Sequence, residues 1–196
     1  IFVMPKVGFC YGVERSIKLT KEIKNKNYPK PYFLLGMLVH NDIVNNDLIT
    51  EGYNIIDNLD DTLKFTSSGT FISTAHGLKE SIKNRIIDKG FTLLDTTCPI
   101  VLNNNKKIIE YYNNGFSVIY IGKNNHQESN VIKEYINLIE NTQDVDNLNI
   151  TNEKLVLTNQ TTMSIYDIEF LTNYVKDKYP NINIDTIICP ATKERQ

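Results

Sequence analysis

Apolar residues recur at helical intervals in three segments of this chain, 13–26, 100–114 and 164–178. Pro99 suits the first turn of the second segment, because a proline there costs no helical hydrogen bond, and Gly115 is a typical stop signal. The pattern therefore predicts three amphipathic helices.

Short apolar runs between these segments predict β-strands. They lie at 1–4, 32–39, 70–74, 117–122 and 154–157, and at the starts of 91–99 and 182–190. Short strands that alternate with helices of roughly 10–15 residues indicate parallel sheets. The expected fold class is α/β, built from small repeated parallel-sheet units.

The cysteines reveal a repeat. Cys98 lies 88 positions after Cys10, and Cys189 lies 91 positions after Cys98. Segments 91–99 and 182–190 have the same form: an apolar run, an Asp-Thr pair, a cysteine and a proline. Equal spacing at domain-like length is typical of repeated units.

Polar landmarks repeat with the cysteines. His40 lies 30 positions after Cys10 and His126 lies 28 after Cys98, each behind an apolar run. In the same way, His76 lies 66 positions after Cys10, and Thr161 lies 63 after Cys98.

These landmarks predict one α/β unit over 11–97 and a second over 98–188. Residues 1–10 and 189–196 are then a strand and a stub of a third unit that is mostly missing, so we expect a chain truncated before its third domain is complete.

Composition narrows the class of protein. Hydrophobic residues make up 41% of the 196 residues and charged residues 22%, which is ordinary for a globular protein. The net charge of −2 gives no basic field for nucleic acid or an anionic membrane. No window reaches the roughly 18 apolar residues of a membrane span, and the first ten residues lack the features of a signal peptide. We expect a cytoplasmic protein, or one in a plastid or apicoplast stroma if the organism has plastids.

The residues that could carry chemistry share one position in the pattern. In open parallel sheets, ligands bind beyond the carboxyl ends of the strands. Every histidine and every cysteine of the chain follows a predicted strand, as does one threonine of the repeat: Cys10, His40, His76, Cys98, His126, Thr161 and Cys189. We therefore expect a ligand site at the strand ends.

Three cysteines at long spacing do not suit a small disulfide framework. Each precedes a predicted helix, whose N-terminus favours the thiolate that binds metal. Three thiolates suit a 4Fe–4S cluster with one iron left open to substrate. A zinc ion, or three unliganded core thiols, remains an alternative at this point.

The histidines at strand ends, together with helix N-termini, would make a pocket for an anion. His126-Gln127-Glu128 adds a carboxylate, which could instead only stabilise a helix N-terminus. Thr161 and Thr162 could be turn or cap residues. Glu14 and Arg15 are interpreted as solvated helix charges or a structural pair.

The motifs resemble, in order, those of the LytB family of 4-hydroxy-3-methylbut-2-enyl diphosphate reductases, over essentially the whole chain. They are Gly8-Phe9-Cys10-Tyr11-Gly12-Val13, Val39-His40-Asn41, Ala75-His76-Gly77, Asp95-Thr96-Thr97-Cys98-Pro99, His126-Gln127-Glu128, Asn159-Gln160-Thr161-Thr162 and the segment from Asp185 to Thr192.

This resemblance implies a pseudo-threefold trefoil of α/β units around one 4Fe–4S cluster. It implies the last step of the non-mevalonate isoprenoid pathway, a reductive dehydration that yields isopentenyl and dimethylallyl diphosphates. The electron donor would be ferredoxin or flavodoxin, and the substrate a small allylic diphosphate. The implied cluster ligands are Cys10, Cys98 and Cys189.

The resemblance also implies roles for the polar residues. His40, His76 and His126 would bind the diphosphate, and Thr162 would line the substrate site. Glu128 would relay protons, with His126 and Thr161 in the same catalytic group.

Two departures from the family pattern are visible. The family continues past Gln196 with a third domain and a further diphosphate-binding loop, so a chain that ends here is expected to bind substrate weakly or not at all. The segment 189–194 also differs from the usual form. The rival hypotheses are a zinc- or thiol-stabilised anion-binding module without catalysis, and an iron–sulfur dehydratase acting on a thioester.

Overall fold

The computed structural model describes residues 8–195, and the chain divides into two compact units, 1–99 and 100–196. The predicted strand at 1–4 lies outside the described residues. The assignment of 1–10 and 189–196 to a third unit stays a prediction.

From residue 11 onward, unit 1 alternates helices and strands. Its elements are α1 (Tyr11–Glu22), the 3₁₀ turn η1 (Ile23–Asn25), β1 (Tyr32–Leu35), α2 (Asp42–Thr50), β2 (Tyr53–Ile56), α3 (Leu59–Phe65), β3 (Thr70–Ile72), α4 (Glu80–Asp88) and β4 (Thr92–Leu94).

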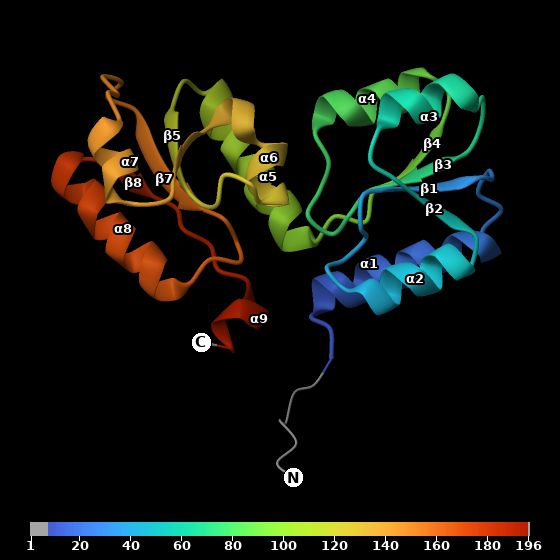
Figure 1. Ribbon diagram of the computed structural model, residues 1–196. Coiled ribbons are helices and arrows are strands. Elements are labelled where there is room, and N and C mark those ends of the chain that lie inside the picture. Colours follow the sequence, from blue (N-terminus) through green and yellow to red (C-terminus); the bar gives the residue numbers. More distant parts are fainter. Residues whose placement is uncertain (1–7, 196) are drawn as a thin grey trace, which may run out of the picture. The chain divides into compact units, whose positions relative to one another are not determined.

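The sheet of unit 1 is parallel, in the order β2-β1-β3-β4, and helices cover both faces (Figure 1). Successive residues of a strand point to opposite faces. Accordingly, Leu34 of β1 packs in the core beneath α1 and α2, whereas Phe33 packs with Phe71 and Ile86 beneath α3 and α4. A sheet buried on both faces explains why its strands read as continuous apolar runs.

Unit 2 repeats this alternation. Its elements are α5 (Pro99–Asn113), β5 (Ser117–Ile121), α6 (Gln127–Val131), the 3₁₀ turn η2 (Lys133–Tyr135), β6 (Asn137–Ile139), α7 (Thr142–Asn147), β7 (Leu155–Asn159), α8 (Ile165–Lys178), β8 (Asn183–Ile184) and α9 (Pro190–Lys193).

The sheet of unit 2 is also parallel, in the order β6-β5-β7-β8, and has a core on each face. Ile119 and Ile121 of β5 pack in the core with α7 and α8. Val118 and Tyr120 pack on the opposite face with Ile108 of α5. The four elements named in Figure 1 as α5, α6, α7 and α8 thus sandwich the sheet.

The two sheets share one strand order, so β1, β2, β3 and β4 correspond to β5, β6, β7 and β8. This confirms the predicted fold class, α/β with repeated parallel-sheet units. The three predicted helices are confirmed as α1 with η1, α5 and α8, and α5 begins at Pro99 as expected.

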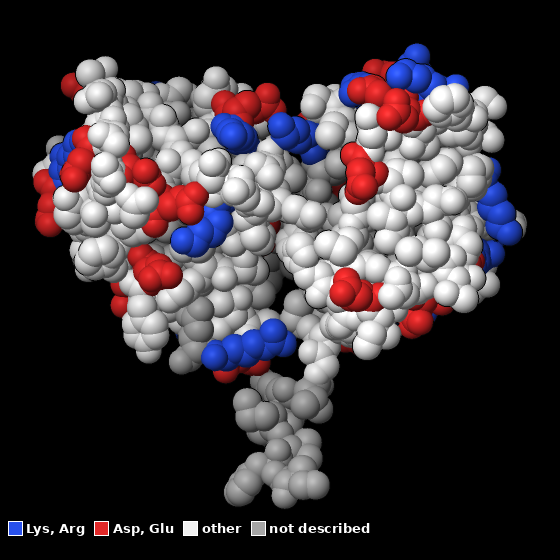
Figure 2. Space-filling view, in the orientation of Figure 1, with Lys and Arg blue, Asp and Glu red and all other residues white. Residues whose placement is uncertain are grey.

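No helix among residues 8–195 combines the length and apolar character needed to cross a membrane. On the face shown in Figure 2, basic side chains lie among acidic ones instead of gathering in one field. Over α3 and α4, for example, Arg85 pairs with Asp60, and Lys64 pairs with Asp61.

Candidate functional site

Two histidines meet at the strand ends of unit 1. His40 follows β1 and His76 follows β3, and these two strands are neighbours in the sheet. The centroids of their imidazole rings are 5.0 Å apart, with 48° between the ring planes. His40 is exposed and His76 is half-buried. Two imidazoles so placed can donate hydrogen bonds to one anionic group.

Cys98 lies at the same edge of unit 1, where β4 leads into α5. Its amide donates to the carbonyl of Ala75, at 2.9 Å. Its sulfur lies against the first turn of α1, because a Cβ added at Gly12 would come within 2.6 Å of Cys98 Sγ. Cys10 is the N-cap residue of the same helix. Both thiols are free and half-buried.

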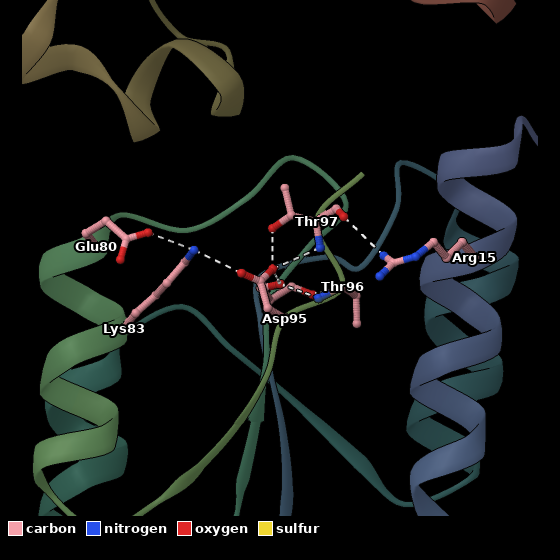
Figure 3. A network of polar contacts seen from close by, with 7 residues as sticks. Arg15, Glu80, Lys83, Asp95, Thr96 and Thr97 are labelled. Carbon is pink, nitrogen blue, oxygen red and sulfur yellow. Dashed lines mark hydrogen bonds and ion pairs between the residues drawn. The ribbon is translucent and has the colours of Figure 1, made fainter. Parts of the chain in front are cut away.

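The segment before Cys98 is held by a polar network centred on Asp95 (Figure 3). The Asp95 carboxylate accepts hydrogen bonds from the amide and hydroxyl of Thr97, and its other oxygen pairs with Lys83 at 2.9 Å. Lys83 also pairs with Glu80, at 2.9 Å.

Burial alone would raise the pKa of Asp95, but the Thr97 hydroxyl, the Lys83 ammonium and the Thr97 amide outweigh it and lower the pKa to about 2. The side chain therefore stays ionised.

Arg15 is neither a solvated charge nor part of a pair with Glu14. Its guanidinium donates to the carbonyl of Thr97 at 3.1 Å, and the residue is half-buried (Figure 3). The interpretation made from the sequence was incomplete because the helical pattern does not show which segment lies opposite α1.

In unit 2, Glu128 and Thr161 form a buried pair. Glu128 follows β5 and Thr161 follows β7, which is its neighbour in the sheet. The Thr161 amide donates to Glu128 Oε2 at 3.0 Å, and the Thr161 hydroxyl donates to the same oxygen at 3.0 Å. Glu128 is only 2% exposed and Thr161 1%.

Burial raises the pKa of Glu128, although the hydrogen bonds from the Thr161 amide and from the Thr161 and Thr162 hydroxyls oppose part of this rise. Burial likewise raises the pKa of Tyr120 well above its usual value, and the nearby Glu128 carboxylate adds to the effect. A carboxyl in such surroundings holds a proton at a higher pH than an exposed glutamate does, as a proton donor must.

His126 is the N-cap residue of α6, and its Nδ1 accepts the Glu128 amide proton at 3.2 Å. An Nδ1 that accepts this bond carries no proton, so the proton of the neutral ring lies on Nε2. Gln160 joins the neighbouring loops by accepting from the Lys123 amide and donating to the Thr162 hydroxyl.

Cys189 is tied to the same region of unit 2. Its amide donates to the carbonyl of Thr161 at 2.8 Å. Two residues earlier, the amide and the carbonyl of Ile187 both bond to the side chain of Asn159. Cys189 is a free, half-buried thiol and is the N-cap residue of α9.

Comparison with known proteins shows the family of this chain. A family model described as LytB protein matches residues 1–196. The chain belongs to the LytB protein family. The 4-hydroxy-3-methylbut-2-enyl diphosphate reductase of Bacillus subtilis (strain 168) is 40% identical over 196 residues, which are 96% of this chain and 62% of that protein. The corresponding protein of Bacillus pumilus is 38% identical, with the same shares. This LytB chain thus spans about 62% of the length of these relatives.

Solved structures agree with the family. The E-1-hydroxy-2-methyl-but-2-enyl-4-diphosphate reductase of Plasmodium falciparum matches with a TM-score of 0.86 and 33% identity, over 97% of this chain and 61% of that one. A second structure, of (E)-4-hydroxy-3-methyl-but-2-enyl diphosphate reductase, the terminal enzyme of the non-mevalonate pathway, gives a TM-score of 0.78 at 25% identity, over 100% and 70% of the two chains.

Within each unit, the LytB chain brings several of the residues singled out from its sequence to one sheet edge. In unit 1 these are His40, His76 and Cys98, and in unit 2 they are Glu128, Thr161 and Cys189, with His126 capping the helix that carries Glu128. Their chemical roles stay predictions. The sequence analysis assigned no role to Ser73 or to Asn159, which it named only as part of a motif, although each is a polar residue at the end of an apolar run.

The cysteines of this LytB chain fit an iron–sulfur cluster in their donor chemistry. All three thiols are free, half-buried and placed directly before a helix. Gly12 leaves beside Cys98 Sγ a space that any side chain would fill. Soft thiolate donors without a neighbouring disulfide partner are the ligands that such clusters use.

Proposed function

We propose that the full-length protein is a 4-hydroxy-3-methylbut-2-enyl diphosphate reductase. The reaction consumes two electrons and two protons, breaks the allylic C–O bond and releases water together with isopentenyl or dimethylallyl diphosphate. The names of the relatives support the reaction class. The observation that carries the proposal is the buried Glu128 carboxyl with its raised pKa, bonded to Thr161.

In this proposal, Cys10, Cys98 and Cys189 hold one 4Fe–4S cluster. When bound, the cluster supplies the electrons and an open, Lewis-acidic iron. Ferredoxin or flavodoxin is the proposed electron donor. Three free thiols at helix starts support this assignment.

The histidines are proposed to bind the diphosphate. The neighbouring rings of His40 and His76 suit a group with several anionic oxygens, since each ring can donate a hydrogen bond to it. His126 is assigned to the same task through its Nε2 proton, because its Nδ1 already accepts the Glu128 amide. Thr162, which is an exposed residue, is proposed to contact the substrate.

Glu128 is proposed to deliver a proton to the departing hydroxyl. Its burial keeps the carboxyl protonated at a higher pH than an exposed glutamate, which makes it a better general acid. Thr161 fixes the direction of the carboxyl through two hydrogen bonds, and its hydroxyl can orient the substrate hydroxyl in turn.

Replacing Glu128 tests this role. In the full-length protein prepared without oxygen, Glu128→Gln should lower turnover by about 100-fold or more, the scale of general acid catalysis, with iron content unchanged. Turnover is measured as substrate-dependent oxidation of reduced methyl viologen. Glu134→Gln, at an exposed glutamate of η2, is the matched control and should keep normal activity.

Normal turnover in Glu128→Gln would remove the proton-transfer role. A folded wild-type protein that carries zinc and reduces nothing would instead favour the non-catalytic anion-binding module.

A further inference from the structure

Ser73 and Asn159 occupy equivalent places in the two units. Ser73 directly follows β3, and Asn159 is the last residue of the corresponding strand β7. Each strand neighbours the one that leads to a cysteine, β4 before Cys98 and β8 before Cys189. Both side chains are 0% exposed. A fully buried polar side chain needs hydrogen-bond partners, and both of these find them in the segment before a cysteine.

In unit 1, Ser73 holds Thr96, two residues before Cys98. Ser73 Oγ accepts the Thr96 amide proton at 2.8 Å, and the Ser73 carbonyl accepts the Thr96 hydroxyl at 2.6 Å. Two residues further along both segments, the Cys98 amide donates to the Ala75 carbonyl at 2.9 Å. The serine and the cysteine are thus joined by one continuous set of bonds.

In unit 2, Asn159 holds Ile187, two residues before Cys189. Asn159 Oδ1 accepts the Ile187 amide proton at 2.9 Å, and Asn159 Nδ2 donates to the Ile187 carbonyl at 2.7 Å. Two residues further along, the Cys189 amide donates to the Thr161 carbonyl at 2.8 Å. The spacing of holding residue, held residue and cysteine is the same as in unit 1.

In each unit, a helix residue six positions after a cysteine donates a further hydrogen bond to this set, which we call the brace. Ser16 of α1 lies six positions after Cys10 and donates to Thr96 Oγ1 at 2.8 Å. Asn104 of α5 lies six positions after Cys98 and donates to the Asn159 carbonyl at 3.0 Å. Both braces are buried.

These bonds begin where the paired strands end, so the sheets do not require them. The residue types differ: a serine bonds to a threonine in unit 1, and an asparagine bonds to main-chain groups in unit 2. In both units, the main chain two residues before a cysteine is held by hydrogen bonds.

We propose that Ser73 and Asn159 are positioning residues for the metal-binding cysteines. Each fixes the main chain before its cysteine, and thereby the direction from which Cys98 or Cys189 presents its sulfur. The inference rests on the proposed function, in which these sulfurs hold a cluster. Groups that orient metal ligands without touching the metal typically alter metal affinity by about 10–100-fold when they are removed.

The test compares iron loss among variants of the full-length protein prepared without oxygen. Ser73→Ala and Asn159→Ala should each release iron to a chelator about tenfold faster than wild type. Their reduced clusters should also give altered electron paramagnetic resonance spectra. In the iron-free protein, amide exchange at Cys98 should become faster in Ser73→Ala, which reports the loosened main chain without any cluster.

Two matched controls lose a buried or half-buried hydrogen bond elsewhere. Thr70→Val removes the hydrogen bond from the Thr70 hydroxyl to the Pro29 carbonyl. Thr70 lies in β3, the strand that Ser73 directly follows. Asn137→Ala removes the bond from the Asn137 amide to the Val118 carbonyl in unit 2. Both controls should release iron at the wild-type rate with an unchanged spectrum.

One outcome would overturn the positioning role but leave the proposed function standing. In it, wild type holds iron, and Ser73→Ala and Asn159→Ala match the controls in iron release and in spectrum. A folded wild type that holds no iron overturns both. If Ser73→Ala does not fold, the milder Ser16→Ala removes only the brace on Thr96 and should speed iron release in the same direction. Wild-type release in both Ser16→Ala and Asn159→Ala would then contradict the proposal.

Discussion

At the scale of single residues, burial decides what the polar groups can do. Glu128 is ionisable yet 2% exposed, and its carboxyl accepts hydrogen bonds from Thr161 and Thr162. For this carboxyl, burial raises the pKa more than these hydrogen bonds lower it, since they replace only part of the lost hydration. The same burial that suits it to donate a proton therefore makes its ionised form costly for the fold.

This cost predicts a pH dependence of stability. The folded-state pKa of Glu128 lies above the unfolded value of about 4.3, so its contribution to stability is greatest below that pH and is lost as pH rises through the folded pKa. The glutamine of the Glu128→Gln variant cannot ionise. Between pH 4 and neutrality, the free energy of unfolding of this variant should therefore rise relative to that of wild type, as measured by urea unfolding at several pH values. The exposed Glu134→Gln should follow the wild-type curve. Parallel curves for Glu128→Gln and wild type would contradict the burial argument.

Gly12 provides a second test at this scale. Alanine is favoured over glycine inside a helix by about 0.5–1 kcal/mol, so propensity alone predicts that Gly12→Ala stabilises the protein. The added Cβ would lie 2.6 Å from Cys98 Sγ, and such overpacking costs about 1–3 kcal/mol. We expect a net loss of about 1 kcal/mol in denaturant unfolding, from the difference of these two effects.

Tyr11→Ala is the control for Gly12→Ala, because Tyr11 is in the same helical turn and 70% exposed. It should change stability by no more than about 0.5 kcal/mol. A stabilised Gly12→Ala protein would show that the sulfur of Cys98 is free to move away.

At the scale of elements, the segment that follows β4 in unit 1 has hydrogen bonds of its own. The strand β4 has three residues, and the hydrogen bonds beyond its end come from Asp95, Thr96 and the Cys98 amide. The Lys83 ammonium of α4 ties the Asp95 carboxylate to the helix that covers the sheet.

Asp95→Asn tests this connection. The lowered pKa of Asp95, about 2, means that its ionised form stabilises the fold above the unfolded pKa of about 3.9, and that this stabilisation is lost as pH falls through 2. The variant should be less stable than wild type by an amount on the order of 1–2 kcal/mol at neutral pH, after discounting for the partly exposed side chain. The difference should shrink in acid, as measured by urea unfolding between pH 3 and 7.

Asp61→Asn is the matched control, because Asp61 makes only an exposed ion pair with Lys64 at 3.2 Å. Such a pair contributes about 0–1 kcal/mol. Equal losses in Asp95→Asn and Asp61→Asn would show that the Asp95 network adds nothing to the stability of the connection.

At the scale of the whole molecule, the repeat decides how much the sequence could predict. The pattern of apolar runs identified the α/β class and the three long helices, because those segments bury a regular stripe. Of the short edge strands, β2 and β6 were missed, since Tyr53–Ile56 and Asn137–Ile139 are short and each contains an asparagine, a residue that is uncommon in strands.

The candidate site divides in the same way. His40, His76 and Thr161 could be found because each follows a strand, and Glu128 because it lies two positions after His126. The proposed role of Ser73 and of Asn159 could not be found in this way, since it depends on hydrogen bonds beyond the paired residues of neighbouring strands. A sequence shows that a polar residue ends an apolar run, but not which main-chain group lies opposite it.

The central claim is that the three cysteines hold one 4Fe–4S cluster in the full-length protein. The most direct measurement is its iron and acid-labile sulfide content after preparation without oxygen, with the visible spectrum recorded before and after exposure to air. The account predicts about four irons and four sulfides per chain, as this cluster type requires, with a brown absorption that bleaches in air. A folded protein that contains zinc or no metal would contradict it.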